Sequence, residues 1–335
     1  MSYTWEYLQR NQKQAKRLVG ISYEQLIQLI EQAKLLHEQR LSEIDKNKTR
    51  LISAGGGKKS QLEEEEQIIL TLIYLRHHLS FQILGLLFQV SESTANNIFN
   101  YWQSLLRESL PASLLEQAKK CEEEEEAIIE MLAEQELIVD SAEQDRERPS
   151  DYQQQKLFYS GKKKNHTFNN QFIVLPKGKD IIDVIAGKPG PKSDISLCRE
   201  RLSEFDKKQL FSGDKAYLGE PQIRTPHKKP KHGELTSQQK EANKKLSSNR
   251  IFVEHVIRLI KIFKIAQERF RLEASKYESI ILTVCGLVRL RIERLVFSAV
   301  KTPEYSKMNE IINLDSLAAE LSTKAPDAYG AIESS

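Results

Sequence analysis

Three carboxylates in this sequence have the residue type and the surroundings that metal-dependent chemistry at phosphorus requires. Asp140 ends a short apolar run, Asp214 lies between glycines after a second one, and Glu254 lies early in a predicted long helix. Carboxylates at strand ends and one on a helix can converge on Mg²⁺, because a hard cation prefers oxygen ligands and keeps waters for substrate phosphates. Two such ions about 4 Å apart could activate a water and stabilise the leaving oxygen of an in-line displacement.

Each acid taken alone has a simpler explanation. An Asp where a strand ends is commonly a cap or turn residue, and Glu254 with Arg258 forms an ordinary i, i+4 pair. A fourth acid, Asp194, follows Ser193 at the start of a predicted helix, where helix capping explains it. The metal-binding hypothesis therefore depends on the surroundings of the three acids.

The charge distribution places these acids in a basic segment. The 335 residues include 50 basic and 47 acidic ones, a net charge of +3, yet residues 61–139 hold 4 basic and 15 acidic side chains and residues 140–264 hold 26 and 16. A site that binds nucleic-acid phosphates through lysines and metal ions through carboxylates needs both signs. Lysines of the basic segment cluster at Lys162, Lys163 and Lys164, at Lys228, Lys229 and Lys231, and at Lys240, Lys244 and Lys245.

Residues 79–98 predict two helices joined by a tight turn. Ser91 is the expected N-cap of the second helix. Short polar side chains near its start would suit a DNA major groove, although a plain helical bundle shows the same pattern. These side chains are Ser93, Thr94, Asn96 and Asn97. Few basic residues lie nearby, so phosphate contacts would come from the core and from Lys58 and Lys59 of a Gly-rich linker.

The remaining pattern predicts a mixed core with helices on both sides. Residues 1–45 and 63–110 have the apolar period of helices. Strand-like runs follow at 156–159, 166–168, 171–175 and 181–186, then a helix at 194–205 and long helices at about 247–274 and 277–300. We expect one α/β or α+β core behind an all-α domain. The expected divisions are an N-terminal helical region (1–54), a linker and helix-turn-helix domain (55–115), the core (116–300) and a C-terminal tail (301–335).

Composition excludes several other classes. The three cysteines lie far apart without a C-x-x-C pair, which argues against a zinc site or a disulfide framework and favours a reducing compartment. No apolar run approaches the roughly 20 residues that span a bilayer, and the first residues lack the apolar run of a signal peptide. We therefore expect a cytoplasmic protein with no membrane partner.

Several strings resemble one family when they are taken together and in order. They are residues 138–144 with Arg148-Pro149, residues 159–167, residues 213–219, and residues 253–258 with 261–263. This set is similar to DDE-type transposases of bacterial insertion sequences, in the branch related to Harbinger-like elements. The resemblance runs from about Gly55 to about Phe270. Ser141 stands where such proteins often have Ala, and Ala216 where Gly is common; neither change removes a proposed ligand.

The resemblance implies a fold and a chemistry. The fold would be a ribonuclease H-like mixed sheet flanked by helices, with Asp140 on the first strand, Asp214 just after the fourth and Glu254 on the helix behind. These three would hold Mg²⁺ or Mn²⁺, as two ions. Hydrolysis at the element ends would expose a 3′-hydroxyl that attacks target DNA without a covalent protein–DNA intermediate.

The implied partner is double-stranded DNA, both the transposon ends and the target. Synapsis of two ends also implies a homo-oligomer, a dimer or larger, in the nucleoid of a bacterial cell. Lys215 and His255 adjoin the acids and are equally consistent with substrate contact or a structural role. The candidate phosphate contacts are Lys58, Lys59, Lys162, Lys163, Lys164, Lys215, Lys228, Lys229, Lys231 and Arg258.

Two alternatives stay open at this stage. A transposase-derived DNA-binding protein that has lost catalysis would share the helix-turn-helix, but it would have no physical need to keep all three acids. A ribonuclease H-like nuclease of DNA repair or RNA would share the core, but it would not need the helix-turn-helix. The complete set of features favours the metal-dependent transposase.

Overall fold

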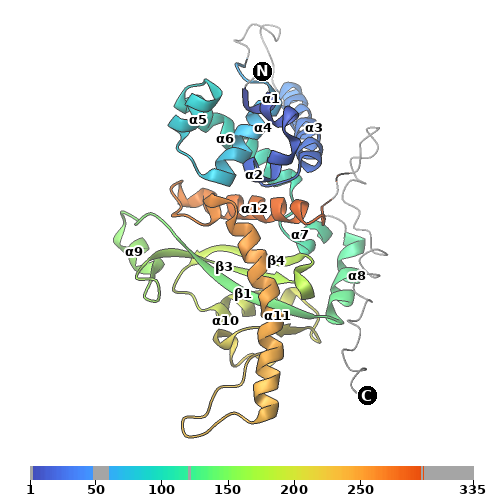
Figure 1. The fold of residues 1–335 in the computed structure, drawn as a ribbon, viewed down its shortest axis with the longest axis vertical. Helices are drawn as coiled ribbons and strands as arrows, with labels where there is room; N and C mark the ends of the chain where they lie inside the picture. Colours follow the sequence, from blue (N-terminus) through green and yellow to red (C-terminus); the bar gives the residue numbers. More distant parts are fainter. Residues whose placement is uncertain (1–2, 48–59, 120–121, 296, 298–335) are drawn as a thin grey trace, which may run out of the picture.

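A computed structural model describes residues 3–47, 60–119, 122–295 and 297, in which a helical part is stacked on a mixed α/β core (Figure 1). The predicted linker with Lys58 and Lys59, and the predicted tail from residue 301, lie outside the described residues. The helices of the first part are α1 (Tyr3–Arg10), α2 (Ala15–Leu18), α3 (Tyr23–Asn47), α4 (Glu64–His77), α5 (Phe81–Phe88) and α6 (Glu92–Ser109).

The predicted pair of helices with a tight turn is confirmed as α5 and α6. Ser80 and Ser91 are their N-caps, and each side-chain oxygen accepts a hydrogen bond from a backbone amide three residues later. Gln89 adopts a left-handed conformation in the turn, with φ of 57°. A Cβ at Gly85 would lie only 2.6 Å from the backbone oxygen of Val90, so glycine allows the turn to pack against α5.

The core is built on a six-stranded mixed sheet. Its strands are β1 (Glu136–Asp145), β2 (Tyr159–Ser160), β3 (Asn165–Val174), β4 (Ile181–Pro189), β5 (Leu210–Ser212) and β6 (Ile223–Arg224). The order is β2-β3-β1-β5-β6, and β4 also pairs with β3. The pairs of β3 with β1, β2 and β4 are antiparallel, whereas β1 with β5 and β5 with β6 are parallel. The predicted α/β class, with a sheet flanked by helices, is confirmed.

Both faces of this sheet are covered because apolar residues alternate along its strands. Ile138 and Phe172 pack toward α11 (Ser237–Lys261) and α12 (Tyr277–Arg291) in the core that also contains the helical part. Leu137, Val139 and Ile173 belong to a second core on the opposite face. That second core includes residues of α7 (Leu114–Ala118), α8 (Glu122–Ala133) and α10 (Asp194–Arg201).

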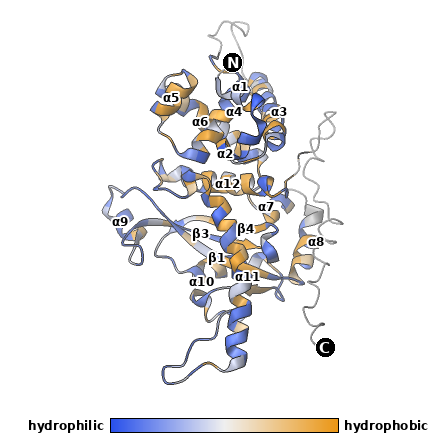
Figure 2. Ribbon diagram, in the orientation of Figure 1, coloured by the Kyte–Doolittle hydropathy of each residue, from blue (hydrophilic) through white to orange (hydrophobic). Residues whose placement is uncertain are grey.

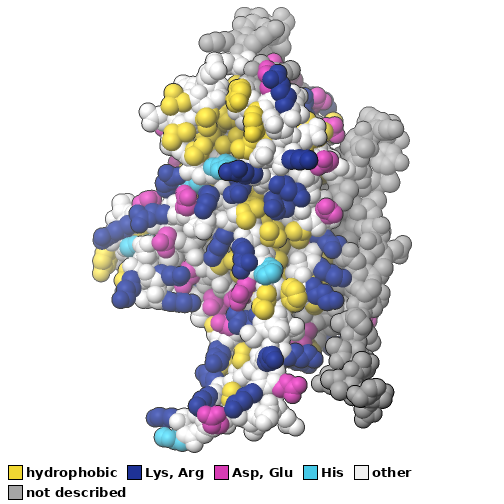
Figure 3. All heavy atoms as spheres, in the orientation of Figure 1, with side chains coloured by type: hydrophobic (Ala, Val, Ile, Leu, Met, Phe, Trp, Pro, Cys, Tyr) yellow, Lys and Arg dark blue, Asp and Glu magenta, His cyan; other side chains and the backbone are white. Residues whose placement is uncertain are grey.

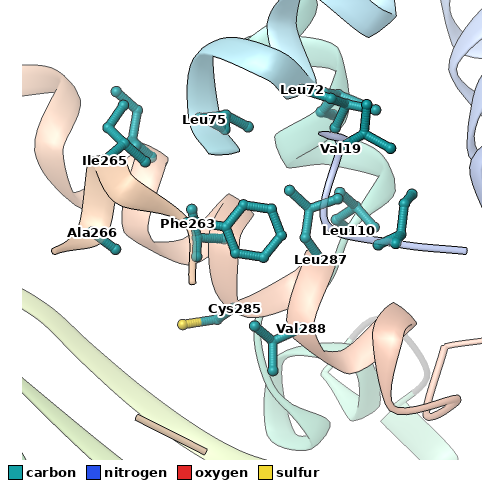
Figure 4. Close-up of a cluster of buried hydrophobic side chains, with 14 of the residues drawn as sticks. Val19, Leu72, Leu75, Leu110, Phe263, Ile265, Ala266, Cys285, Leu287 and Val288 are labelled. Atoms are coloured by element: carbon teal, nitrogen blue, oxygen red, sulfur yellow. The ribbon is translucent and has the colours of Figure 1, made fainter. Parts of the chain in front are cut away.

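Helix α12 joins the helical part to the core. It is buried along most of its length and contacts both α6 and β4. Figure 4 shows the apolar cluster at this junction, where Leu72 and Leu75 of α4 meet Phe263, Leu287 and Val288. One hydrophobic core runs through both parts, so α5 and α6 share it with the sheet, α11 and α12.

Buried polar contacts strengthen this junction. The Arg289 side chain donates to both carboxylate oxygens of Asp180, at 2.7 and 2.8 Å, and to the backbone oxygens of Pro111 and Ser113. A Cβ at Gly286 would lie 2.7 Å from the backbone oxygen of Leu110, so only glycine lets α12 approach the end of α6 this closely.

Several predicted element boundaries are wrong. The strand predicted at 156–159 is mostly α9 (Tyr152–Phe158), because Asp151 caps that helix and accepts from the Gln154 amide at 2.8 Å. The two runs at 166–168 and 171–175 form the single strand β3, since the polar residues between them pair in the middle of the sheet. The later helix predicted from 277 ends at Arg291.

Helix α11 begins earlier and ends earlier than predicted. Thr236 and Gln239 form a capping box, so the helix starts at Ser237, ten residues before the predicted start. This first half is polar and projects from the body of the protein (Figures 1 and 2), and it therefore lacks the apolar period that the prediction used. The helix ends at Lys261, and a 3₁₀ turn at Lys264–Ala266 follows.

Candidate active site

A cavity of about 720 Å³ opens between the sheet and α11 and contains two of the three predicted acids, Asp140 and Glu254. Six basic side chains also line it: Arg76, Lys162, Lys163, Arg258, Lys261 and Lys264. Figure 3 shows basic side chains spread widely over this face of the molecule. A cavity with both charge signs can hold phosphates and cations together.

The sheet register explains why Asp140 and Asp214 are neighbours. Strands β1 and β5 are parallel, and Ile138 of one pairs with Ser212 of the other as the last paired residues. Asp140 lies two residues after Ile138 on β1, and Asp214 lies two residues after Ser212, just beyond β5. The two Asp residues therefore lie at the same level on adjacent strands. The prediction that Asp140 ends its strand is wrong: β1 continues to Asp145 because it stays paired with β3 after β5 has ended.

The Asp140 carboxylate is largely buried and close to several charges. Its side chain is 18% exposed and lies 3.6 Å from the Arg250 guanidinium. Burial raises the pKa of Asp140 above its ordinary value, and nearby Asp214 and Asp194 act in the same direction, whereas the Ser141 amide and Arg250 oppose them. The ionised form is therefore destabilised, and a bound cation would favour it.

Asp214 is placed just after β5 and begins a 3₁₀ turn. Its Oδ1 accepts a hydrogen bond from the Ala216 amide at 2.7 Å. The resemblance put this residue after the fourth strand; when the two-residue β2 is counted, β5 is the fifth strand. Asp214 does not line the cavity itself but lies beside its Asp140 wall.

Glu254 projects from α11, on the other side of the cavity. It is exposed and lies one helical turn after Arg250, the residue that contacts Asp140. Within the described part of the chain, no three Asp, Glu, His or Cys side chains are close enough together to hold one ion. The structure thus brings the three acids to one region of the molecule but not to one point.

The predicted phosphate contacts fall into separate groups. Lys162, Lys163 and Arg258 line the cavity. Lys164, next to Lys163 in the sequence, and Lys215, next to Asp214, are exposed. The lysines of the predicted loop, Lys228, Lys229 and Lys231, are exposed on the segment before α11, and Lys229 pairs with Glu234 at 3.0 Å.

At the start of α6, the predicted base-contacting residues differ in exposure. Ser93 and Thr94 are exposed and bond to the Ser91 hydroxyl at 2.9 and 2.8 Å. Asn97 is exposed, whereas Asn96 is half-buried and accepts a hydrogen bond from the Asn100 side chain at 3.0 Å. Asn97 is therefore the better candidate of the two amides for contact with a base.

Several cations at the site were not predicted, among them Arg250 and Lys261. Arg250 lies four residues before Glu254, so helical spacing alone could have identified it. Burial lowers the pKa of Lys261, and the neighbouring Lys163 contributes in the same direction. Both residues place positive charge against the carboxylates in this structure.

The explanation of Asp194 as a helix cap is wrong. Ser193 occupies the N-cap position of α10, but no side chain there bonds to the backbone of the first turn. The Ser193 hydroxyl bonds instead to Ser196, and Asp194 Oδ1 accepts from the Asn169 side chain at 3.0 Å. Asp194 and Asn169 both line the cavity that contains Asp140.

Comparison with known proteins defines the class of this protein. Residues 139–289 match the family described as DDE superfamily endonuclease, and residues 60–112 match the helix-turn-helix of DDE superfamily endonuclease. The chain belongs to this superfamily, and it is a transposase of the DDE family with a helix-turn-helix DNA-binding domain. Endonucleases of the superfamily use divalent metal ions.

One relative makes the relationship more specific. The chain is 32% identical over 213 residues to a protein of Microchaete diplosiphon, the probable transposase for insertion sequence element IS702. The match covers 61% of this chain and 72% of that protein. No solved structure gives a significant match. None of the helices in the described ranges is long and apolar enough to cross a membrane.

Proposed function

We propose that this transposase binds the inverted repeats at the ends of its element, cuts the DNA there, and joins the freed ends to target DNA. The proposed ligands of the divalent metal are Asp140, Asp214 and Glu254. The parallel register of β1 and β5 is the observation that carries this proposal, because it sets the Asp214 carboxylate beside Asp140, which lines the cavity. We also propose that the chain is divided into domains after residues 54, 115 and 300.

The residues present fit a hard divalent cation in type. All three candidate ligands offer carboxylate oxygens, and the pKa of Asp140 is raised by burial and by neighbouring acids, which extra positive charge would offset. Mg²⁺ is commonly held by one or two carboxylates, with waters and substrate phosphates as its other ligands, so three converging side chains are not needed before DNA binds. We propose Mg²⁺ or Mn²⁺, as two ions.

When bound, the metal supplies a Lewis acid that activates the attacking oxygen and stabilises the leaving oxygen. Lys162, Lys163 and Arg258 line the cavity, and in this proposal they hold the phosphates on either side of the scissile bond. In the first step the oxygen of a water molecule bonds to phosphorus and the bond between phosphorus and O3′ breaks. O3′ takes up a proton and becomes the 3′-hydroxyl. In the second step that hydroxyl attacks a target phosphodiester and displaces its O3′. The paired DNA ends call for a homo-oligomer.

The proposal is tested with DNA duplexes that carry the ends flanking this gene. Cleavage is measured with Mg²⁺ or Mn²⁺ for the parent and for Asp140→Asn, Asp214→Asn and Glu254→Gln. Each variant is expected to lose at least roughly 100-fold in rate, because changes merely beside metal ligands already cost about 10- to 100-fold. Asp151→Asn is the matched control. Asp151 lies outside the cavity, and Asn caps a helix as well as Asp does, so α9 should be preserved.

The outcome also separates the alternatives. Unchanged cleavage by all three variants would show that the assignment of the acids is wrong. A parent that binds the ends selectively without cutting them would instead identify a DNA-binding protein that has lost catalysis. Cleavage without preference for the ends would favour a general nuclease.

A further inference from the structure

A buried tyrosine links the two chain segments that carry Asp140 and Asp214. Tyr217 is fully buried and ends the 3₁₀ turn that Asp214 begins. Its hydroxyl shares a hydrogen bond of 2.9 Å with the hydroxyl of Ser141, which directly follows Asp140 on β1. One side chain therefore joins the segment after β5 to the neighbouring strand, across 76 positions of the sequence.

The ring of Tyr217 packs against the backbone just before Asp214. A Cβ built on Gly213 would lie 2.8 Å from Cδ2 and 3.1 Å from Cγ of this ring, so only a glycine leaves room for the ring there. The ring thus contacts the residue before Asp214, while the hydroxyl bonds to the residue after Asp140.

The Tyr217 hydroxyl is also held by a third segment of the sheet. The side-chain nitrogen of Gln171, on β3, donates to it at 3.1 Å and to the Asp194 backbone oxygen at 2.8 Å. Tyr217 belongs to the second core, with Val139, on the face of the sheet opposite α11. It does not line the cavity, so any effect it has on chemistry there passes through the backbone.

We propose that Tyr217 is a positioning residue, which holds the turn that begins at Asp214 against β1 and so sets the separation of the Asp140 and Asp214 carboxylates. This inference rests on the proposed function, in which both carboxylates bind the divalent cation. Pairing of β1 with β5 ends at Ile138 and Ser212, two residues before each acid. Beyond that point the Tyr217 hydroxyl supplies a bond between the two segments. Groups that orient metal ligands change metal affinity or activity about 10- to 100-fold.

The test compares two buried tyrosines that lose the same kind of contact. Tyr217→Phe removes only the hydroxyl and keeps the ring in the core. Tyr277→Phe is the matched control, because the buried Tyr277 hydroxyl donates to Gln144 at 2.8 Å and accepts from Asn170 at 2.7 Å, and Tyr277 lies outside the cavity. Circular dichroism and urea unfolding show whether each variant folds.

The first readout does not depend on catalysis. Hydrogen exchange followed by mass spectrometry reports on the backbone amides of residues 213–219, among them the Ala216 amide that donates to Asp214. Exchange of this segment should become about 2- to 10-fold faster in Tyr217→Phe, the equivalent of one net hydrogen bond, and should not change in Tyr277→Phe. Unchanged exchange in Tyr217→Phe would overturn the inference, because the turn would then be held without the hydroxyl.

The second readout is the Mn²⁺ concentration that gives half-maximal cleavage of the element-end duplexes. It should rise about 10-fold in Tyr217→Phe, and the rate should recover at saturating Mn²⁺, because the carboxylates themselves are intact. Tyr277→Phe should need the same Mn²⁺ concentration as the parent. An equal rise in both variants would show a general loosening of the core and would also overturn the inference.

Ser141→Ala tests the same hydrogen bond from its other end. It should shift the Mn²⁺ dependence in the same direction as Tyr217→Phe but by less, because Gln171 still donates to the Tyr217 hydroxyl. If Tyr217→Phe does not fold, Ser141→Ala decides the question, and an unchanged Mn²⁺ dependence in it refutes the positioning role.

Asp140→Asn and Asp214→Asn separate this inference from the proposed function. If both lose cleavage while Tyr217→Phe behaves as Tyr277→Phe does, the positioning role is refuted and the proposed function stands. Unchanged cleavage by both Asn variants overturns the proposed function, and the positioning role fails with it.

Discussion

The buried ion pair of α12 gives the sharpest prediction of stability. Arg289 is fully buried and Asp180 is 3% exposed. Four hydrogen bonds leave the guanidinium, two to Asp180 and two to backbone oxygens at the end of the helical part. The change Arg289→Met keeps much of the side-chain volume and removes all of these donors.

The expected loss can be estimated from what remains. Asp180 would keep only the bond from the Ile181 amide, at 2.7 Å, and would be a buried charge without a counter-ion. Removing one partner of such a pair costs about 3–5 kcal/mol, a large part of a typical folding free energy of about 5–15 kcal/mol. Replacing both charges with apolar groups is often close to neutral, so Asp180→Leu with Arg289→Met should recover at least half of the loss.

The assay is urea unfolding followed by two signals. Both tryptophans, Trp5 and Trp102, lie in the helical part, so their fluorescence reports on it, whereas far-ultraviolet circular dichroism reports on the whole chain. Because one core joins the two parts, both signals should change together in the parent. Arg10→Met, which breaks an exposed pair with Glu6, is the control and should cost no more than about 1 kcal/mol.

Two results would refute the reasoning about this pair. A loss below about 1 kcal/mol for Arg289→Met would mean that the buried charge finds another partner. A double variant as unstable as the sum of its single changes would mean that the pair is not coupled.

The remaining predictions concern the junction, the thiols and DNA recognition. Gly286→Ala should destabilise the protein by about 1–3 kcal/mol, since its Cβ would lie 2.7 Å from a backbone oxygen; urea unfolding measures this. Burial raises the pKa of Cys198 and Cys285 to about 12, so at pH 8 a thiol reagent should modify them roughly 1000-fold more slowly than unfolded chain. Because the folded state holds the thiol protons more tightly than the unfolded state does, these two cysteines do not change the pH dependence of stability below about pH 9. The free energy of unfolding falls as pH rises from about 9 to 12. Asn97→Ala should lower the preference for element-end DNA over random DNA by about 1–3 kcal/mol in competition binding.

Each of these has its own control. Gly233→Ala, where a Cβ meets only Pro230 at 3.6 Å or beyond, should be nearly neutral, and equal losses at both glycines would contradict the packing argument. Fast modification of both thiols in native protein would contradict their burial. Equal loss of affinity for both DNAs in Asn97→Ala would exclude direct base contact there.

The sequence predicts the catalytic core where its physical signals are local. The apolar run before Asp140 is a strand, the Ser80 and Ser91 caps start two helices, and the glycines around Asp214 accompany a turn. Long-range pairing is what local patterns cannot supply. The register that sets Asp140 beside Asp214, and the contact of Asn169 with Asp194, join residues 74 and 25 positions apart, and only the folded sheet reveals them.

Other misses come from polar segments. The first half of α11 is exposed and polar, so capping and propensity stabilise it without an apolar period. Arg250 has the i, i+4 spacing to Glu254 in the sequence, but its contact with Asp140 depends on how α11 packs on the sheet, which only the folded structure shows.

The burial of α12 has a consequence for how this protein reads DNA. Because this helix packs against both α6 and β4, the recognition helix cannot swing freely relative to the cavity. Under the proposed function, the protein then fixes the distance along the DNA between the bases that it contacts and the phosphodiester bond that it cuts. Adding about 5 base pairs, half a helical turn, between the two would turn that phosphate to the far side of the duplex. The position of the cut would then be set by the span of the protein, whatever the sequence at the cut itself.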